Sequence, residues 1–251
     1  MSDMTADDRG TTTIAVVLYP GLTALDLVGP LQVLTELERF APRYRTVVVG
    51  RNTEPMATDL PLQLVADRTF AEIPHPDVLV VPGGRIGTIR AMSDAGVRAY
   101  VRTAAASADV VGSVCTGSLI LGAVGLLQGR HATTNWFFAG VLESLGATYH
   151  RQRWIEDGNV TMSAGVSAGI DWALHLVAQL TDEATARRVQ LAFDYDPQPP
   201  FGGIDWAHVP ALPRTMRGAI ALAAPAIAAR PKRLTRADRK APADAEPAGR
   251  P

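Results

Sequence analysis

Runs of apolar and β-branched residues recur along this 251-residue chain, and each is followed by a turn signal and then by a helical pattern. The clearest runs are residues 13–19, 77–81 and 109–114. Nearly continuous apolar strands suit a parallel sheet that is covered on both faces. Strands that alternate with helices favour a doubly wound arrangement. We therefore predict an α/β fold with a doubly wound, mostly parallel sheet and helices on both faces.

Further patterns extend the alternation. A helix is predicted from Pro30 to about Phe40, because proline is tolerated in a first helical turn. Ser93 and Thr181 are predicted to cap two further helices, which end near residues 108 and 193. The remaining strands are expected at 44–50, 60–65, 131–134, 149–156 and 160–163, and the remaining helices at 136–145 and 169–180.

Charge and cysteine content narrow the class of protein. Lys and Arg number 24 and Asp and Glu number 25, so no strong basic balance points to nucleic acid. One cysteine cannot form an internal disulfide, which fits a reducing cytoplasm. Neither a signal peptide nor an apolar stretch of the ~18 residues that a membrane helix needs is evident. We expect a cytoplasmic protein without nucleic-acid or membrane partners.

The composition also predicts the domain organisation. Residues 1–12 are polar and are expected to be a disordered N-terminus. Residues 231–251 are rich in Pro, Ala, Arg and Asp, with almost no large apolar side chains, and are expected to form a disordered tail. The chain between them, residues 13–230, is predicted to be a single α/β domain with a C-terminal helical segment.

The only cysteine, Cys115, lies between the apolar run 109–114 and a small-residue helical pattern at 116–123. This strand–nucleophile–helix order is that of a nucleophile elbow. Helix N–H groups near the thiol are expected to favour its thiolate form. The alternative is a small buried cysteine with a packing role only.

Two other loops follow predicted strands and are expected at the same edge of the sheet. Gly83 and Gly84 allow close backbone approach, and with the Thr116 N–H they predict an oxyanion hole. Asp26 lies among apolar residues in the loop after the first strand, where burial would raise its pKa and suit it to proton transfer. The alternatives are an ordinary tight turn for the glycines and, for Asp26, a helix N-terminal cap or an acid in the first helical turn.

No histidine follows the cysteine closely enough to predict a Cys/His dyad. His75, His131 and His175 are interpreted as structural or solvated, and His150 stays open as a base. Paired cysteines and closely spaced histidines are lacking, so no metal site is expected.

In order and spacing, six motifs resemble the ThiJ/PfpI superfamily, which is related to the class I glutamine amidotransferase domain, and within it the isonitrile hydratase branch. The resemblance runs from about residue 13 to 201. The motifs are residues 26–30, 81–84, 113–118, 132–134, 167–171 and 195–201.

The resemblance implies a flavodoxin-like homodimer that needs no cofactor and adds water to R–N≡C, a small molecule, to yield an N-substituted formamide. In that branch the residues matching Asp26, Cys115 and Thr116 carry activity. Two routes stay open: attack of the Cys115 thiolate on the isonitrile carbon, or activation of water by Asp26 with Cys115 as the acid.

Asn135 stands where the family commonly has histidine, and it cannot exchange a proton near neutral pH. We expect it at the substrate or oxyanion group. Thr116 replaces the histidine of the superfamily's proteases, which argues against peptidase activity. The alternatives are a cysteine-based redox sensor, a glyoxalase-type aldehyde hydratase and the ligand-binding half of an AraC-type regulator. The last is disfavoured, since no recognition helix is evident after residue 201.

Overall fold

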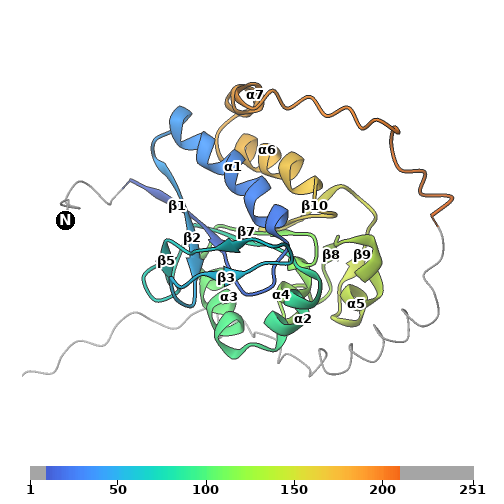
Figure 1. Ribbon diagram of the computed structural model, residues 1–251, viewed down its shortest axis with the longest axis horizontal. Coiled ribbons are helices and arrows are strands. Elements are labelled where there is room, and N and C mark those ends of the chain that lie inside the picture. Colours follow the sequence, from blue (N-terminus) through green and yellow to red (C-terminus); the bar gives the residue numbers. More distant parts are fainter. Residues whose placement is uncertain (1–9, 210–251) are drawn as a thin grey trace, which may run out of the picture.

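A computed structural model describes residues 10–209, and a seven-stranded sheet forms its centre (Figure 1). All neighbouring strands are parallel except β10 (Trp154–Asp157) and β11 (Val160–Ser163), which form an antiparallel pair at one edge of the sheet. The predicted doubly wound, mostly parallel sheet is therefore confirmed. Across the sheet the strands are β10 (Trp154–Asp157), β11 (Val160–Ser163), β7 (Val110–Val114), β6 (Val78–Val81), β1 (Thr12–Val17), β2 (Tyr44–Gly50) and β5 (Arg68–Thr69).

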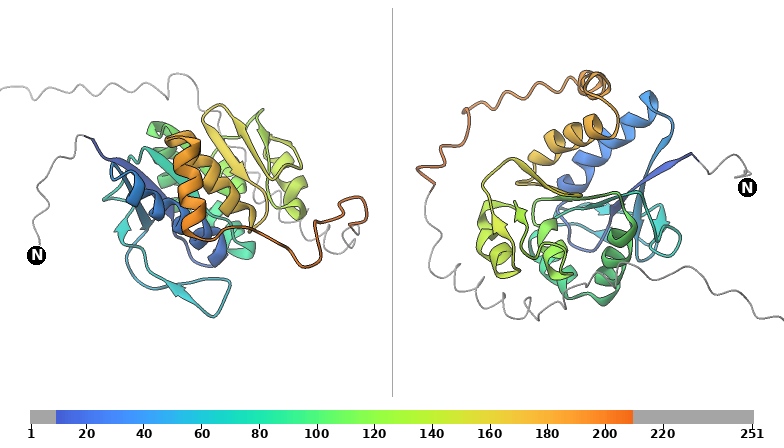
Figure 2. Two further views of the ribbon diagram at one scale, coloured as in Figure 1. Left: turned by 90° about the horizontal axis from the view of Figure 1, so that it is seen from above. Right: turned by 180° about the vertical axis from the view of Figure 1, so that it is seen from behind.

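Helices cover both faces of the sheet, as predicted (Figures 1 and 2). On one face lie α1 (Ala24–Phe40) and α6 (Ala168–Leu180), with α7 (Glu183–Ala192) packed against them. The other face carries α2 (Arg85–Ser93), α3 (Ala95–Ser107) and α4 (Gly117–Ala123). No helix within residues 10–209 is both long and apolar enough to cross a bilayer.

Smaller elements lie outside the main sheet. A hairpin of β3 (Met56–Ala57) and β4 (Gln63–Leu64) follows β2, and β8 (His131–Ala132) pairs in parallel with β9 (Thr148–Tyr149). The 3₁₀ helix η1 (Trp136–Phe138) and α5 (Ala139–Ser144) connect β8 to β9. The single strand expected at 149–156 is therefore two strands, because β9 pairs with β8 and β10 with β11.

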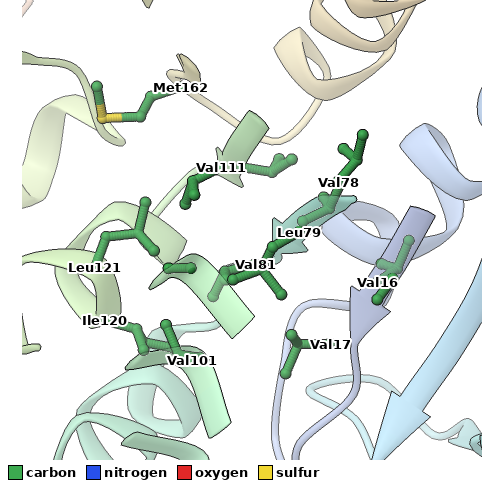
Figure 3. Packing of buried hydrophobic residues seen from close by; sticks show 14 of the residues in the cluster. Val16, Val17, Val78, Leu79, Val81, Val101, Val111, Ile120, Leu121 and Met162 are labelled. Atoms are coloured by element: carbon green, nitrogen blue, oxygen red, sulfur yellow. The ribbon is translucent and has the colours of Figure 1, made fainter. Parts of the chain in front are cut away.

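Burial on both faces explains the continuous apolar runs. All four residues of β6 are buried, and Val81 belongs to the same cluster as Val101 of α3 and Ile120 of α4 (Figure 3). On the opposite face the ring of Trp172 in α6 lies over Gly112, only 2.6 Å from where a Cβ would stand. Each fully buried Val or Leu side chain contributes ~1.5–3 kcal/mol, so this cluster holds the carboxyl ends of the strands in place.

The prediction that Pro30 opens the first helix is wrong. The helix begins at Ala24, six residues earlier, which places Asp26 in its first turn and not in a loop. Its start is held by Asp59 of the hairpin loop, whose carboxylate accepts hydrogen bonds from the Ala24 N–H (3.2 Å) and the Thr23 hydroxyl (2.9 Å). A cap that comes from 35 residues away leaves no local signal. Pro30 stands inside the helix and has no N–H to offer the Asp26 carbonyl.

Two predicted caps are each wrong by one residue. Ser93 ends α2, a helix that the sequence patterns missed, and Asp94 caps α3 by accepting the Val97 N–H at 2.9 Å. Likewise Asp182, and not Thr181, caps α7 by accepting the Thr185 N–H at 2.7 Å. In both cases the aspartate that follows the predicted Ser or Thr accepts the helix N–H in its place.

The predicted disordered ends fall mainly in residues 1–9 and 210–251, which lie outside the described residues. The predicted domain end near residue 230 lies there too. β1 begins at Thr12, so the first strand starts one residue before the predicted domain boundary.

We predict that Asp94→Ala lowers the free energy of unfolding by about 1 kcal/mol, because α3 loses its cap. Ser93→Ala is the matched control and is expected to change it by less than about 0.5 kcal/mol, since Ser93 is exposed. Urea unfolding followed by circular dichroism measures both. Equal losses in the two variants would contradict the assignment of the cap.

Candidate active site

The strand order reverses between β1 and β6. The chain leaves β1 through α1 toward β2 on one side, and leaves β6 through α2 and α3 toward β7 on the other. At such a switch point the connections diverge and leave a crevice outside the carboxyl ends of the strands. Asp26, Gly83 and Cys115 follow β1, β6 and β7, so all three candidate segments meet at this edge.

Cys115 occupies a strained turn at the end of β7. Its φ is 55°, and it is one of two non-glycine residues with positive φ in residues 10–209. The Cys115 N–H donates to the Ser163 carbonyl (3.1 Å), and its own carbonyl accepts from the hydroxyls of Ser118 (3.1 Å) and Thr134 (3.0 Å). These bonds hold the turn, and the predicted strand–turn–helix elbow is confirmed.

Gly83 lies against both other candidate residues. A Cβ at this position would stand 2.7 Å from the Thr116 hydroxyl oxygen and 2.8 Å from Oδ2 of Asp26. Any side chain would therefore displace one of them. The glycine is required by this close approach of three segments, because the Asp26 carboxyl occupies the space that a side chain would take.

Asp26 is completely buried. Neither of its carboxyl oxygens has a partner of good hydrogen-bond geometry in the described part of the chain. Burial raises the pKa of Asp26 to about 7, and the nearby Cys115 thiol and Gly83 N–H lower it only in part. The charge of Asp59, which also holds the start of α1, raises the pKa further. The expected raised pKa of Asp26 is thus confirmed.

The expectation that helix N–H groups favour a thiolate is wrong for the resting site. Burial first, and then the charge of Asp26, raise the pKa of the Cys115 thiol well above its usual range. The Thr116 N–H lowers it, but by less. The Cys115 thiol is only 6% exposed, so it lacks the hydration that a thiolate needs, and the N–H and hydroxyl of Thr116 do not replace that hydration.

Asp26 and Cys115 consequently behave as one unit. The charge of Asp26 raises the pKa of Cys115, whereas the neutral Cys115 thiol lowers the pKa of Asp26 by donating to its carboxylate, so near neutral pH the pair carries at most one negative charge. With that charge on Asp26 the carboxylate is a base beside a thiol. With it on Cys115 the thiolate is a nucleophile beside a carboxylic acid. A single proton shift between them exchanges these two forms, which is what general acid–base and nucleophilic catalysis both require.

Residues 12–179 match the sequence model of the DJ-1/PfpI family. The chain belongs to this family. It is 43% identical over 188 residues to isonitrile hydratase of Pseudomonas putida, in a match that covers 75% of this chain and 80% of the hydratase. The ThiJ/PfpI resemblance drawn from the motifs is therefore confirmed.

Two further comparisons bear on the family's range. A crystal structure of a ThiJ/PfpI family protein from Pseudomonas syringae superposes with a TM-score of 0.77 at 36% identity, covering 91% of this chain and 97% of that one. The chain is also 30% identical over 180 residues to the HTH-type transcriptional regulator CdhR of Pseudomonas aeruginosa. That match covers 70% of this chain and 53% of the regulator. This family therefore contains both enzymes and regulators.

The three backbone N–H groups predicted to form an oxyanion hole, those of Gly83, Gly84 and Thr116, differ in whether they already have an acceptor. The Gly84 N–H donates to the Thr116 hydroxyl at 2.9 Å, so in this structure it already has an acceptor. The Thr116 N–H lies close to the thiol and the Gly83 N–H close to the Asp26 carboxyl, as their effects on the two pKa values indicate. Of the three predicted donors, Gly83 and Thr116 face the reacting pair.

Asn135 has a structural contact of its own. Its Oδ1 caps η1 by accepting the Phe137 N–H at 3.1 Å, which leaves its amide NH₂ for other partners. The preceding residue, Thr134, holds the Cys115 carbonyl, so Asn135 stands next to the elbow in the chain. Its contact with a substrate stays a prediction.

The histidines have partners other than the Cys115 thiol. His150 Nε2 lies 2.7 Å from His131 Nδ1, and His175 contacts Glu156. None of them contributes to the pKa of Cys115. Sequence reasoning missed Asp59, which starts α1 and acts on Asp26, because its role depends on the hairpin's position in space.

Replacing Asp26 by Asn is predicted to stabilise the protein at alkaline pH. The folded state holds the Asp26 pKa near 7, above its ordinary value of 3.8, so the unfolded chain ionises first. Stability from this group is present below about pH 4 and falls as pH rises to about 7. Asp26→Asn should raise the free energy of unfolding by up to about 4 kcal/mol at pH 8 and by little at pH 4.

Denaturant titration at both pH values measures this effect. Asp182→Asn is the control of opposite sign, because hydrogen bonds from Thr185 lower the pKa of Asp182 in the folded state. Its loss should destabilise the protein above pH 4. If both variants shift stability in the same direction at pH 8, the folded state does not raise the pKa of Asp26.

Proposed function

We propose that this protein is an isonitrile hydratase, a cofactor-independent lyase that adds water to a small isonitrile and releases an N-substituted formamide. The observation that carries the proposal is the buried Asp26 carboxyl coupled to the Cys115 thiol at the elbow. The 43% identity to the Pseudomonas putida hydratase supports it. The matching of Asp26, Cys115 and Thr116 to the active residues of that branch, implied by the resemblance, supports it too.

In the covalent route the pair supplies both a nucleophile and a proton. The Cys115 sulfur bonds to the terminal carbon of R–N≡C while the proton held by Asp26 passes to that carbon, which gives the thioimidate R–N=CH–S–Cys. The Asp26 carboxylate then takes a proton from water as its oxygen adds to the same carbon. Asp26 gives that proton to the nitrogen, the C–S bond breaks, and the hydroxyl proton of the intermediate passes to the sulfur, so that R–NH–CHO leaves and the thiol is restored.

In the direct route the sulfur forms no bond to carbon. Asp26 takes a proton from water as the water oxygen attacks the isonitrile carbon, and the Cys115 thiol gives its proton to that carbon. The product R–N=CH–OH becomes the formamide by moving one proton from oxygen to nitrogen, and Asp26 returns its proton to the sulfur. Both routes use the same two groups and the same single charge.

The backbone and the surroundings suit a small, largely apolar substrate. We propose that the N–H groups of Gly83 and Thr116 bind the oxygen of the attacking water, which gains negative charge as Asp26 takes its proton. The Asn135 NH₂ is proposed to bind the same polar end. Large apolar side chains are exposed in the segments that carry these residues, namely Leu25, Val28, Ile86 and Trp136.

The alternative functions are less well supported by this geometry. Redox sensing favours an accessible thiol with a low pKa, whereas Cys115 is buried with a raised pKa. A glyoxalase-type aldehyde hydratase would use the same pair, so only substrate tests separate it from the proposal. The chain matches 53% of the regulator's length, and a regulatory role would appear as ligand binding without turnover.

A homodimer is part of the proposal, as the family resemblance implied. Within the described residues, α7 and the segment that follows it expose Leu191, Phe201 and Ile204. We propose that these side chains are covered where this segment packs against a second copy of the chain. Sedimentation equilibrium of the full chain tests this assignment.

Turnover of cyclohexyl isocyanide to the formamide is expected for the wild type and is expected to fall at least about 10³-fold in Cys115→Ala and in Asp26→Asn, because each removes half of the reacting pair. Asp182→Asn is the matched control for loss of a carboxylate away from the site and should keep wild-type turnover. Formamide release is measured by chromatography. A folded wild type that converts no isonitrile but hydrates glyoxal would replace this proposal with the aldehyde activity.

The pH dependence is predicted to report the coupled pair. The pair gains its negative charge as Asp26 ionises, so kcat/KM should rise with pH through about 7 and then stay level. The same profile should govern alkylation of Cys115 by iodoacetamide. In Asp26→Asn the step near pH 7 should disappear from the alkylation profile. A step that persists in that variant would assign it to another group.

A further inference from the structure

Three buried hydroxyl groups form a chain that runs up to the elbow. Tyr19 follows β1, Thr88 belongs to α2 and Thr116 follows Cys115, and each is at most 2% exposed. The Tyr19 oxygen lies 3.1 Å from the Thr88 hydroxyl, and the Thr88 hydroxyl lies 2.9 Å from that of Thr116. Tyr19 also donates to the Pro82 carbonyl at 2.8 Å, and Gly84 N–H donates to Thr116 at 2.9 Å.

Only one order of protons satisfies all four of these hydrogen bonds. A carbonyl cannot donate, so the single proton of Tyr19 goes to Pro82. The bond between Tyr19 and Thr88 must then use the Thr88 proton, and the bond between Thr88 and Thr116 must use the Thr116 proton. In this order the Thr116 proton goes to Thr88 in the resting site, although the Thr116 hydroxyl also lies close enough to the sulfur to lower the pKa of Cys115. The longer contact of 3.2 Å from Thr116 to the Gly84 carbonyl is the one left without a proton.

The two ends of this hydroxyl chain are hydrogen-bonded to the same loop. Tyr19 holds the carbonyl of Pro82, and Thr116 holds the N–H of Gly84, with Gly83 between them. The Thr116 end is also fixed to the elbow, because Thr116 is the residue after Cys115. The hydroxyl chain therefore sets the distance between the Gly83 N–H and the Thr116 N–H, the two donors that lie next to Asp26 and Cys115.

We infer that Tyr19 and Thr88 are positioning residues of this site and that they act on the reaction through Thr116, whose hydroxyl orients the loop and does not protonate the substrate. Buried hydroxyls of this kind are costly to leave unpaired, so loss of one member loosens the others. For turnover the inference rests on the proposed function. For the reactivity of Cys115 it does not.

The test compares four single variants of the full chain and one double variant, Tyr19→Phe with Thr88→Val. Thr88→Val removes the middle hydroxyl at nearly constant shape, and Thr88→Ser restores it. Thr161→Val is the matched control, because it also deletes a buried threonine hydroxyl, the one that accepts Trp172 Nε1–H at 2.8 Å on the other face of the sheet. Each is assayed for the rate of Cys115 alkylation by iodoacetamide, for kcat and KM with cyclohexyl isocyanide, and for urea unfolding.

Thr88→Val is expected to slow alkylation and lower kcat by about tenfold each, the effect of about one lost hydrogen bond, with KM changed much less. Thr88→Ser should recover most of both rates. Thr161→Val should lose stability like Thr88→Val but keep both rates. Tyr19→Phe should also slow the enzyme, and combined with Thr88→Val it should cost less than the product of the single effects.

Two results would overturn the inference. One is a Thr88→Val protein whose alkylation is as fast as that of the wild type, which would make the hydroxyl chain purely structural. The other is equal impairment of Thr88→Ser and Thr88→Val, which would mean that shape and not hydrogen bonding matters. If the wild type turns over no isonitrile, the proposed function fails, but the alkylation rates still decide this inference.

Discussion

The left-handed turn at Cys115 is the constraint on which the rest of the site depends. It is unfavourable for a residue with a side chain, so neighbouring segments must hold it. Ser163 of β11, Ser118 of α4 and Thr134 after β8 each bond the cysteine's own peptide groups. Because these partners come from three different elements, the turn exists only when the sheet and the helices are already assembled. The position of the thiol thus depends on the whole fold.

The second organising feature is the burial of an ionisable carboxyl group beside a thiol. Asp26 is buried without a cation or a well-formed hydrogen bond within residues 10–209, which is unusual for an ionisable group. Placing a thiol beside it makes two acids compete for one negative charge. Neutral backbone groups of Gly83 and Thr116 complete the site, so its electrostatics change by moving a proton inside the pair and not by recruiting a distant group. This suits addition of water to a neutral molecule.

Local sequence patterns predicted the sheet, the elbow and the three segments that meet there, since apolar runs and glycine positions are local signals. They failed where a distant residue decides. The sequence allows a first-turn position for Asp26, but the start of α1 ahead of Pro30 depends on Asp59 and has no local signal. The contacts of Thr88 with Tyr19 and with Thr116 join residues 69 and 28 positions apart, and nothing in the sequence marks them. The thiol's raised pKa depends on burial, which periodicity does not measure.

The cap that Asp59 provides has a consequence for how this protein can vary. The tip of a surface hairpin is ordinarily a place where residues are inserted or deleted at little cost. Here the tip is joined to the first turn of α1, and through it to the buried acid. A change in hairpin length would move the start of the helix and the charge beside Asp26 together. Variation across such loops is therefore a means of tuning the acidity of the site from outside it, without replacing any residue that touches the substrate.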